Sequence, residues 1–239
     1  MEYKYSLPSG MSLLKEAWHL MKSKLSVLVT LSVIVSGMSF LFEILFPTNQ
    51  DGTVENVSMY FFVFLAVYAV SQFWAQLALI LAVGQTVSAR EAITKSPALF
   101  WPYAWASILV GFIVIGGFIL LIIPGIIFSF WYSLYGYTVI LENLRGMAAL
   151  RKSKEYVKGY ILQIIWRWLV LVPVIVVMLI PIFLLDDYKL ATNIYSAILV
   201  LFSAPYLTAY QYLIYKHLKE IKFMSIPQEQ PSEVVPSMV

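Results

Sequence analysis

Residues that could carry acid–base or metal chemistry are few in this chain and stand apart from one another. The two histidines, His19 and His217, lie in basic segments beside apolar runs, without a cluster of further ligands. Cysteine is absent, which excludes disulfides, thiolate nucleophiles and Cys-ligated metals. Asp186 and Asp187 fall in a short turn, so they form no acid–base pair inside a span. We therefore expect no enzyme active site, no cofactor and no metal site.

A second set of polar residues lies in or beside the apolar runs, where charges are expensive and often functional. Arg167 stands about seven residues into its run, roughly 10 Å by helical rise. It could snorkel to the interface, pair with Glu142 or bind a ligand directly. Gln72 and Gln76 are four residues apart and share a helix face. They suit either interhelical hydrogen bonds or a polar substrate path.

Basic residues gather in segments that flank the apolar runs. Those expected to contact lipid headgroups are Lys15, Lys22, Arg90, Arg151, Lys152, Lys154 and Lys158. Each basic residue near an anionic surface contributes about 1 kcal/mol of binding. Anionic membrane lipids are therefore the expected partners, and nucleic acid is not. A membrane or peripheral protein partner is left open.

The composition places the chain among membrane proteins. Of 239 residues, 61% are hydrophobic and 12% are charged, and the mean hydropathy is +0.81. Soluble domains carry about 25% charged residues, so such a chain needs an apolar solvent around it. We expect one membrane domain over residues 1–222. The proline-containing segment 223–239 has few apolar residues and predicts a disordered cytoplasmic tail.

Six apolar runs predict an all-α protein with six transmembrane helices. Their expected bounds are Leu25–Phe46, about Val57–Val83, about Tyr103–Ile122, Ile126–Leu141, about Ile161–Leu185 and about Leu190–Tyr215. Before them, Ser9–Lys24 has an amphipathic pattern. That segment either lies at the membrane surface or packs on the protein itself.

The third and fourth runs are separated by Pro124 and Gly125. Proline cannot donate to a continuing helix, and glycine tolerates the backbone geometry of a reversal. A single helix through both runs would be roughly 58 Å long, about twice the thickness of a bilayer's hydrocarbon core. We therefore expect a tight hairpin turn at this proline–glycine pair.

The distribution of lysine and arginine predicts the orientation. The N-terminal segment carries four, the second loop two, the fourth loop five and the C-terminal end three, whereas the opposite loops carry only Lys189. By the positive-inside rule, both termini are cytoplasmic. A weak repeat of the basic segments before the first, third and fifth spans suggests three hairpins, each preceded by a cytoplasmic amphipathic helix. The alternative is that shared membrane constraints alone produce three similar segments.

One stretch resembles a known family. It runs from Leu121-Ile122-Ile123-Pro124-Gly125-Ile126 through Glu142-Asn143-Leu144-Arg145-Gly146-Met147-Ala148-Ala149-Leu150-Arg151-Lys152-Ser153 to Val157-Lys158-Gly159. This pattern is similar to the glycerophosphoryl diester phosphodiesterase membrane domain family and related six-span prokaryotic proteins of unknown function. The resemblance covers residues 120–160 and implies a multi-pass protein of a prokaryotic cell membrane. It supplies no catalytic residues.

Two functions fit these observations. The first is a non-enzymatic, lipid-associated membrane module that helps a partner, with its basic helices on anionic headgroups. The alternative is a small transporter or permease for a solute or lipid, built on the Gln72 and Gln76 face.

Overall fold

The computed structural model describes residues 6–46, 59–185 and 188–224, and all regular structure in these ranges is helical. The helices are α1 (Gly10–Ser23), α2 (Leu25–Leu45), α3 (Met59–Gly84), α4 (Ala89–Leu120), α5 (Ile122–Trp131), α6 (Tyr135–Leu141), α7 (Gly146–Val157), α8 (Ile161–Leu184) and α9 (Lys189–Met224). The predicted outer loop near residue 50 and the predicted tail from residue 225 onward lie outside the described residues.

Within the described residues, six helical segments are long and apolar enough to cross a membrane, which confirms the predicted all-α class with six candidate spans. They are α2, α3, α4, the α5–α6 segment, α8 and α9. α9 is longer than the predicted sixth span and continues beyond Tyr215 to Met224. The last turns of α9 therefore project past the apolar part and carry the basic residues of that end.

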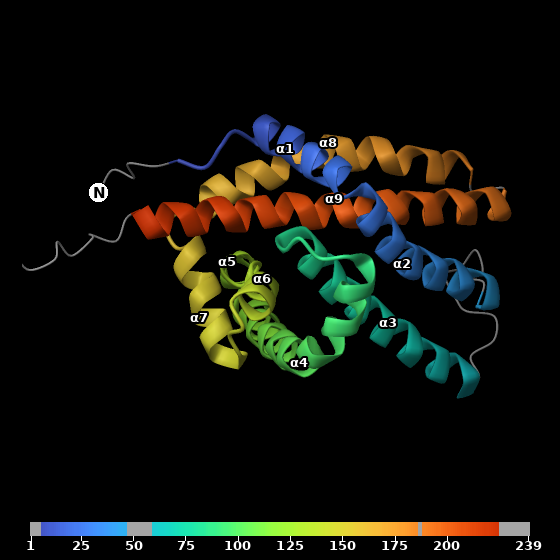
Figure 1. The fold of residues 1–239 in the computed structure, drawn as a ribbon, viewed down its shortest axis with the longest axis horizontal. Helices are drawn as coiled ribbons and strands as arrows, with labels where there is room; N and C mark the ends of the chain where they lie inside the picture. The colour runs from blue at the N-terminus through green and yellow to red at the C-terminus, as the bar shows by residue number, and fades with distance from the viewer. Residues whose placement is uncertain (1–5, 47–58, 186–187, 225–239) are drawn as a thin grey trace, which may run out of the picture.

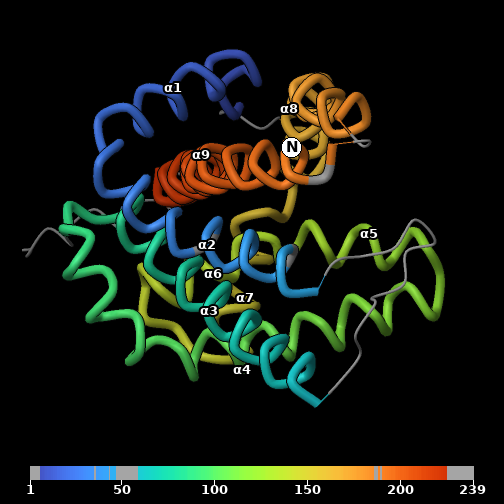
Figure 2. Tube along the Cα trace, turned by 90° about the vertical axis from the view of Figure 1, so that its right-hand side faces the viewer, coloured from blue at the N-terminus to red at the C-terminus, as the bar shows by residue number. Residues whose placement is uncertain are grey.

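The helices do not form one parallel bundle. In Figure 1, α9 runs along the long axis, with α1 and α8 on one side and α2 and α3 on the other. The C-terminal part of α4 and the whole of α5 are seen nearly end-on in that view. Figure 2 shows these two segments from the side. This pair thus runs across the direction of α9.

α1 packs on the bundle through one face. Leu13, Ala17 and Met21 follow one another at a spacing of four residues, and all three are buried in the common core beside α8 and α9. Trp18 remains 46% exposed on the outer side. Of the two alternatives for this segment, the structure shows the one in which its apolar face is covered by the protein.

The turn between α4 and α5 lies one helical turn earlier than the sequence predicted. α4 ends at Leu120, and the chain reverses at Leu121, which has an extended backbone (φ −162°, ψ 149°). The prediction of a turn at Pro124-Gly125 itself is wrong. Pro124 occupies the first turn of α5, where its missing N–H would have no intrahelical partner in any case.

Gly125 has a packing role instead of a turn role. A Cβ atom built on it would lie 2.5 Å from the ring of Phe118, and one built on Gly117 would lie 3.0 Å from Gly125 Cα. The two glycines therefore let the backbones of α4 and α5 approach closely, as small residues do between membrane helices. This contact is what holds the apolar pair together beside its exposed tip at Leu120–Ile123.

The predicted fourth span is interrupted between α5 and α6. Residues 132–134 leave the helix, and their backbone groups are bonded by side chains from elsewhere. Ser153 Oγ accepts from Leu134 N at 3.2 Å and donates to Trp131 O at 2.8 Å, while Gln211 Nε2 donates to Ser133 O at 2.7 Å. Irregular backbone at this depth is tolerated because the protein satisfies it internally.

α4 also differs from its prediction. It begins at Ala89 and runs for 32 residues through both Pro97 and Pro102, so the second basic segment belongs to the helix. Ser88 caps it by accepting from Glu91 N at 3.2 Å. Prolines inside a helix remove backbone hydrogen bonds and bend the helix.

Candidate functional site

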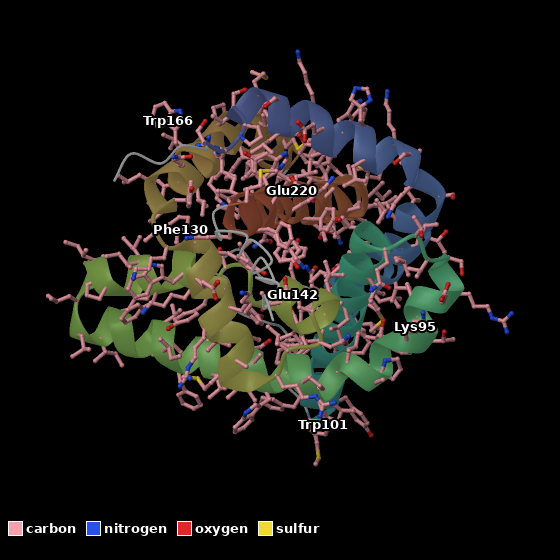
Figure 3. The ribbon with its side chains drawn as sticks, turned by 60° about the vertical axis from the view of Figure 1, so that its left-hand side comes forward. Lys95, Trp101, Phe130, Glu142, Trp166 and Glu220 are labelled. Carbon is pink, nitrogen blue, oxygen red and sulfur yellow. The ribbon has the colours of Figure 1, made fainter. Side chains whose placement is uncertain are left out.

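A polar cluster lies where α6, α7 and α9 meet at one end of the molecule. Glu142, just after α6, accepts at Oε1 from Tyr215 (2.6 Å), Tyr156 (2.8 Å) and Lys219 Nζ (2.9 Å). Figure 3 shows Glu142 inside the bundle. The sequence singled out Glu142, but its partners come from segments 14 to 77 residues away, so their convergence could not be predicted.

The charge of Glu142 is stabilised by these contacts. Burial alone would raise the pKa of this carboxyl, but the bonds from Tyr215, Lys219 and Tyr156 and the charge of Lys219 outweigh it and lower the pKa below 4.5. For Tyr156, burial and the bond to Glu142 raise the pKa. The cluster therefore holds a carboxylate and a phenol in fixed protonation states, which suits a structural tie.

A groove of about 530 Å³ opens beside this cluster. Its walls are the end of α3, the end of α6 and the last turns of α9, with lining residues that include Gly84, Leu141, Tyr215, Lys216, Lys219 and Phe223. Lys216 and Lys219 are each within 4.0 Å of a carboxylate, so the groove is close to neutral. It has no strong preference for an anion or a cation.

α7 carries the densest group of predicted lipid contacts, and they divide into two kinds. Arg151 and Lys158 are exposed and have no ion pair within the described residues. Lys152 pairs with Glu155 at 3.0 Å, and Lys154 Nζ lies 3.9 Å above the ring of Trp131. The first two are free to meet an anionic surface, whereas the second two already contact the protein.

The other predicted lipid contacts lie on two more elements. Lys15 and Lys22 are exposed on α1, and Lys22 Nζ lies 5.0 Å above the ring of Trp18. Arg90 is exposed in the first turn of α4. A cation beside an exposed tryptophan is typical of a protein surface at the headgroup level.

Arg167 binds the N-terminal segment. It is 8% exposed, and its guanidinium donates to Pro8 O (3.0 Å), Leu7 O (2.6 Å) and Gln163 O (2.7 Å). Gln163 Oε1 also accepts from Leu7 N at 3.2 Å. The guanidinium is therefore bound by backbone carbonyls and does not pair with Glu142. It ties the segment before α1 to α8.

The two glutamines of α3 are half-buried. Gln72 Nε2 donates to Ser39 Oγ at 3.4 Å, and Ser39 Oγ is 3.3 Å from Tyr68 OH, so this face makes contacts between α2 and α3. Gln76 lies one turn further along α3. These contacts match the interhelical alternative for Gln72.

Two polar side chains make contacts that the sequence did not predict. Lys24 donates from Nζ to Ala82 O (2.7 Å), Val83 O (3.0 Å) and Gln85 O (2.7 Å) and so caps the end of α3. His217 Nε2 lies 3.8 Å from Glu16 Oε2, between α9 and α1. The only sequence signal for Lys24 was a cation at the start of a span.

The described residues contain no group of three or more His, Asp or Glu side chains placed to hold a metal ion. What they do contain is exposed basic residues on α1, α4 and α7, held on a packed apolar frame. Such an arrangement can attract anionic headgroups by charge.

The chain matches no family model, no curated protein and no solved structure. The resemblance to the glycerophosphoryl diester phosphodiesterase membrane domain family therefore stays a prediction from residues 120–160.

Proposed function

We propose that this protein is a non-enzymatic, lipid-associated module of a prokaryotic cell membrane. Its six apolar segments lie in the bilayer as three hairpins, α2–α3, α4 with α5–α6, and α8–α9, with the α4–α5 pair tilted across the direction of α9. Both termini and α7 lie on the cytoplasmic side, where α1 and α7 hold basic residues against anionic headgroups. In this role it gathers or orients lipid for a membrane or peripheral protein partner.

The observation that carries the proposal is the division of α7 into a buried face and a charged face. Ala149, Leu150 and Val157 are buried in the core, whereas Arg151 and Lys158 are exposed. Because the apolar face is covered, α7 has no need to insert into the bilayer. Its free cations are presented at a fixed place, and lipid attraction by α7 is then electrostatic and sensitive to salt.

α1 supports the same function at a second place on the molecule. Its buried face packs on α8 and α9, and Arg167 binds the segment that precedes α1. Lys15 and Lys22 are left on the outer side with Trp18. Two docked helices with free cations give the protein a basic surface made from segments about 130 residues apart in the sequence.

The experiment compares spin-labelled phosphatidylglycerol with spin-labelled phosphatidylcholine around the reconstituted full chain. We expect selectivity for the anionic lipid that falls as salt rises. The double variant Arg151→Gln, Lys158→Gln should weaken it by up to about thirtyfold, at about 1 kcal/mol per lost charge. The matched control is Lys154→Gln, whose cation already contacts Trp131. Equal association of both lipids at low salt would refute the proposal.

The transporter alternative has less support. The unwound segment between α5 and α6, where a broken helix could bind a substrate, is already bonded by Ser153 and Gln211. Gln72 contacts Ser39 on the neighbouring helix. We therefore favour the lipid-associated function.

A further inference from the structure

A mostly apolar groove lies between α3 and α4, away from the Glu142 cluster. One hollow of about 370 Å³ is lined by Val70, Trp74, Pro97, Phe100 and Trp101. A second of about 370 Å³ continues along α3 and shares Val70 and Trp74 with the first. Both helices are long and apolar enough to span a membrane, and in the proposed membrane setting this groove faces hydrocarbon.

The groove follows from the proline in α4. Pro97 has no N–H, so the carbonyl of Ile93, four residues earlier, loses its helical donor. The indole N–H of Trp74 donates to that carbonyl instead, at 3.4 Å. This bond crosses from α3 to α4 and fixes the indole as a wall between the two helices. The groove is therefore built into the fold.

A cation stands at one end of the same helix face. Pro97 and Trp101 stand seven and eleven residues after Arg90, which places each of them within about 20° of Arg90 around an ideal helix of 3.6 residues per turn. Arg90 is exposed and has no ion pair within the described residues. The neighbouring carboxylate of Glu91 is paired with Lys95 at 2.7 Å. Trp101 is 77% exposed and lies on the outer surface of α4 (Figure 3).

We infer that this groove binds one phospholipid of the anionic class. An acyl chain lies along Trp74 and Trp101, and the phosphate contacts Arg90. The eleven residue steps from Arg90 to Trp101 correspond to at most roughly 16 Å of helical rise, about half of a bilayer's hydrocarbon thickness, which is the reach of one acyl chain. A long apolar groove that ends at an unpaired cation complements one acyl chain and the negative headgroup of such a phospholipid.

The inference deepens the proposed function and rests on it for the membrane setting, but it uses different residues. The basic surface of α1 and α7 would attract anionic lipids in general, whereas the α3–α4 groove would hold one lipid in a defined place. Arg90 and Arg151 therefore serve as a matched pair of exposed arginines, one at the groove and one on α7.

The test uses the full chain in vesicles of phosphatidylglycerol and phosphatidylcholine, with either lipid brominated on its acyl chain while the composition is kept constant. Bromine quenches tryptophan fluorescence on contact, and the difference between the parent protein and Trp101→Phe isolates the signal of Trp101. We expect brominated phosphatidylglycerol to quench this signal with about fivefold higher relative affinity. Arg90→Gln should reduce the ratio to about one, and Arg151→Gln should leave it unchanged.

Three results would overturn the inference. Equal quenching by both lipids in the parent protein would mean that Trp101 contacts only bulk bilayer. A ratio that survives Arg90→Gln would mean that the arginine does not select the lipid. Absence of quenching by either lipid would mean that a second copy or another protein covers the groove. If instead the Arg151 and Lys158 variant leaves lipid selectivity intact while Arg90→Gln abolishes the ratio at Trp101, the proposed role of α7 fails and the groove site stands.

Discussion

Several backbone carbonyls without a helical partner accept a hydrogen bond from a side chain in this protein. Trp74 bonds the carbonyl of Ile93, and Ser153 bonds that of Trp131. Lys24 donates to the last carbonyls of α3, and Arg167 donates to a carbonyl of the segment before α1. In a membrane, where water is not available to replace them, such bonds cost several kcal/mol to leave unmade. These side chains are where single substitutions should matter most.

Lys24 gives the clearest stability test at this scale. Lys24→Met keeps most of the side-chain length but removes the donor for three carbonyls at the end of α3. We expect a loss of about 1–3 kcal/mol in unfolding free energy, measured by denaturant titration in micelles. Lys22→Met, on the exposed side of α1, should change it by less than about 0.5 kcal/mol. Equal effects of the two variants would contradict the capping role.

Glu142 predicts a pH dependence. Its pKa in the folded protein lies below the ordinary value of 4.5, so its contribution to stability is present above pH 4.5 and is lost as the pH falls through the lowered value. We expect the thermal midpoint of the parent protein to drop in that acidic range. Glu142→Gln should reduce stability at neutral pH and flatten the drop, whereas Glu155→Gln, in an exposed pair, should keep it. An unchanged acid profile in Glu142→Gln would contradict the role of the cluster.

These contacts show which features of the site could be predicted from the sequence. A buried arginine in Arg167 and a carboxylate at a span end in Glu142 were recognisable, since charges near hydrocarbon need partners. Their partners were not, because Leu7 and Lys219 come from distant segments. A composition or periodicity argument cannot specify which carbonyl a side chain reaches.

At the scale of elements, two contacts fix how the helices are arranged. Arg167 and Gln163 bind the segment that leads into α1, and these bonds hold α1 on α8. Gly117 and Gly125 let α4 and α5 pack backbone to backbone. The sequence predicted both elements but misplaced the reversal, because a proline near a helix start is as compatible with the first turn of a helix as with a break.

Removal of Arg167 should release α1. Arg167→Met leaves the carbonyls of Leu7 and Pro8 without a donor and should reduce the opening free energy of residues 6–24 by about 2 kcal/mol. Amide hydrogen exchange in that segment would then be about thirtyfold faster, while α3 is unchanged. Arg151→Met, on exposed α7, should leave the exchange of the segment as it is. Uniform acceleration across all helices would indicate general destabilisation instead of a local tie.

The glycine contact offers a matched pair of substitutions. Gly125→Ala places a methyl group against the ring of Phe118 and should destabilise the protein by about 1–3 kcal/mol through overpacking. Gly116→Ala meets no atom within 4 Å and should be neutral or stabilise the helix by up to about 1 kcal/mol. Unfolding in micelles measures both. A tolerated Gly125→Ala would mean that α4 and α5 are not held by this approach.

At the scale of the whole molecule, the described residues contain six apolar helical segments with basic residues beside them. The class and the number of segments could be predicted, because membrane helices must be long and apolar and because lysine and arginine mark one side. The crosswise course of α4 and α5 in Figure 1 could not be predicted, since an apolar run carries no information on its neighbours. The proposed function depends on α1, α7 and both termini lying on one side.

The most direct test of that arrangement is labelling of single cysteines in intact cells, since the chain has no cysteine of its own. Met147→Cys lies on exposed α7, and Asn56→Cys lies in the predicted outer loop. An impermeant maleimide should label Asn56→Cys in intact cells, and Met147→Cys only after the membrane is opened. Labelling of Met147→Cys from outside would contradict the account.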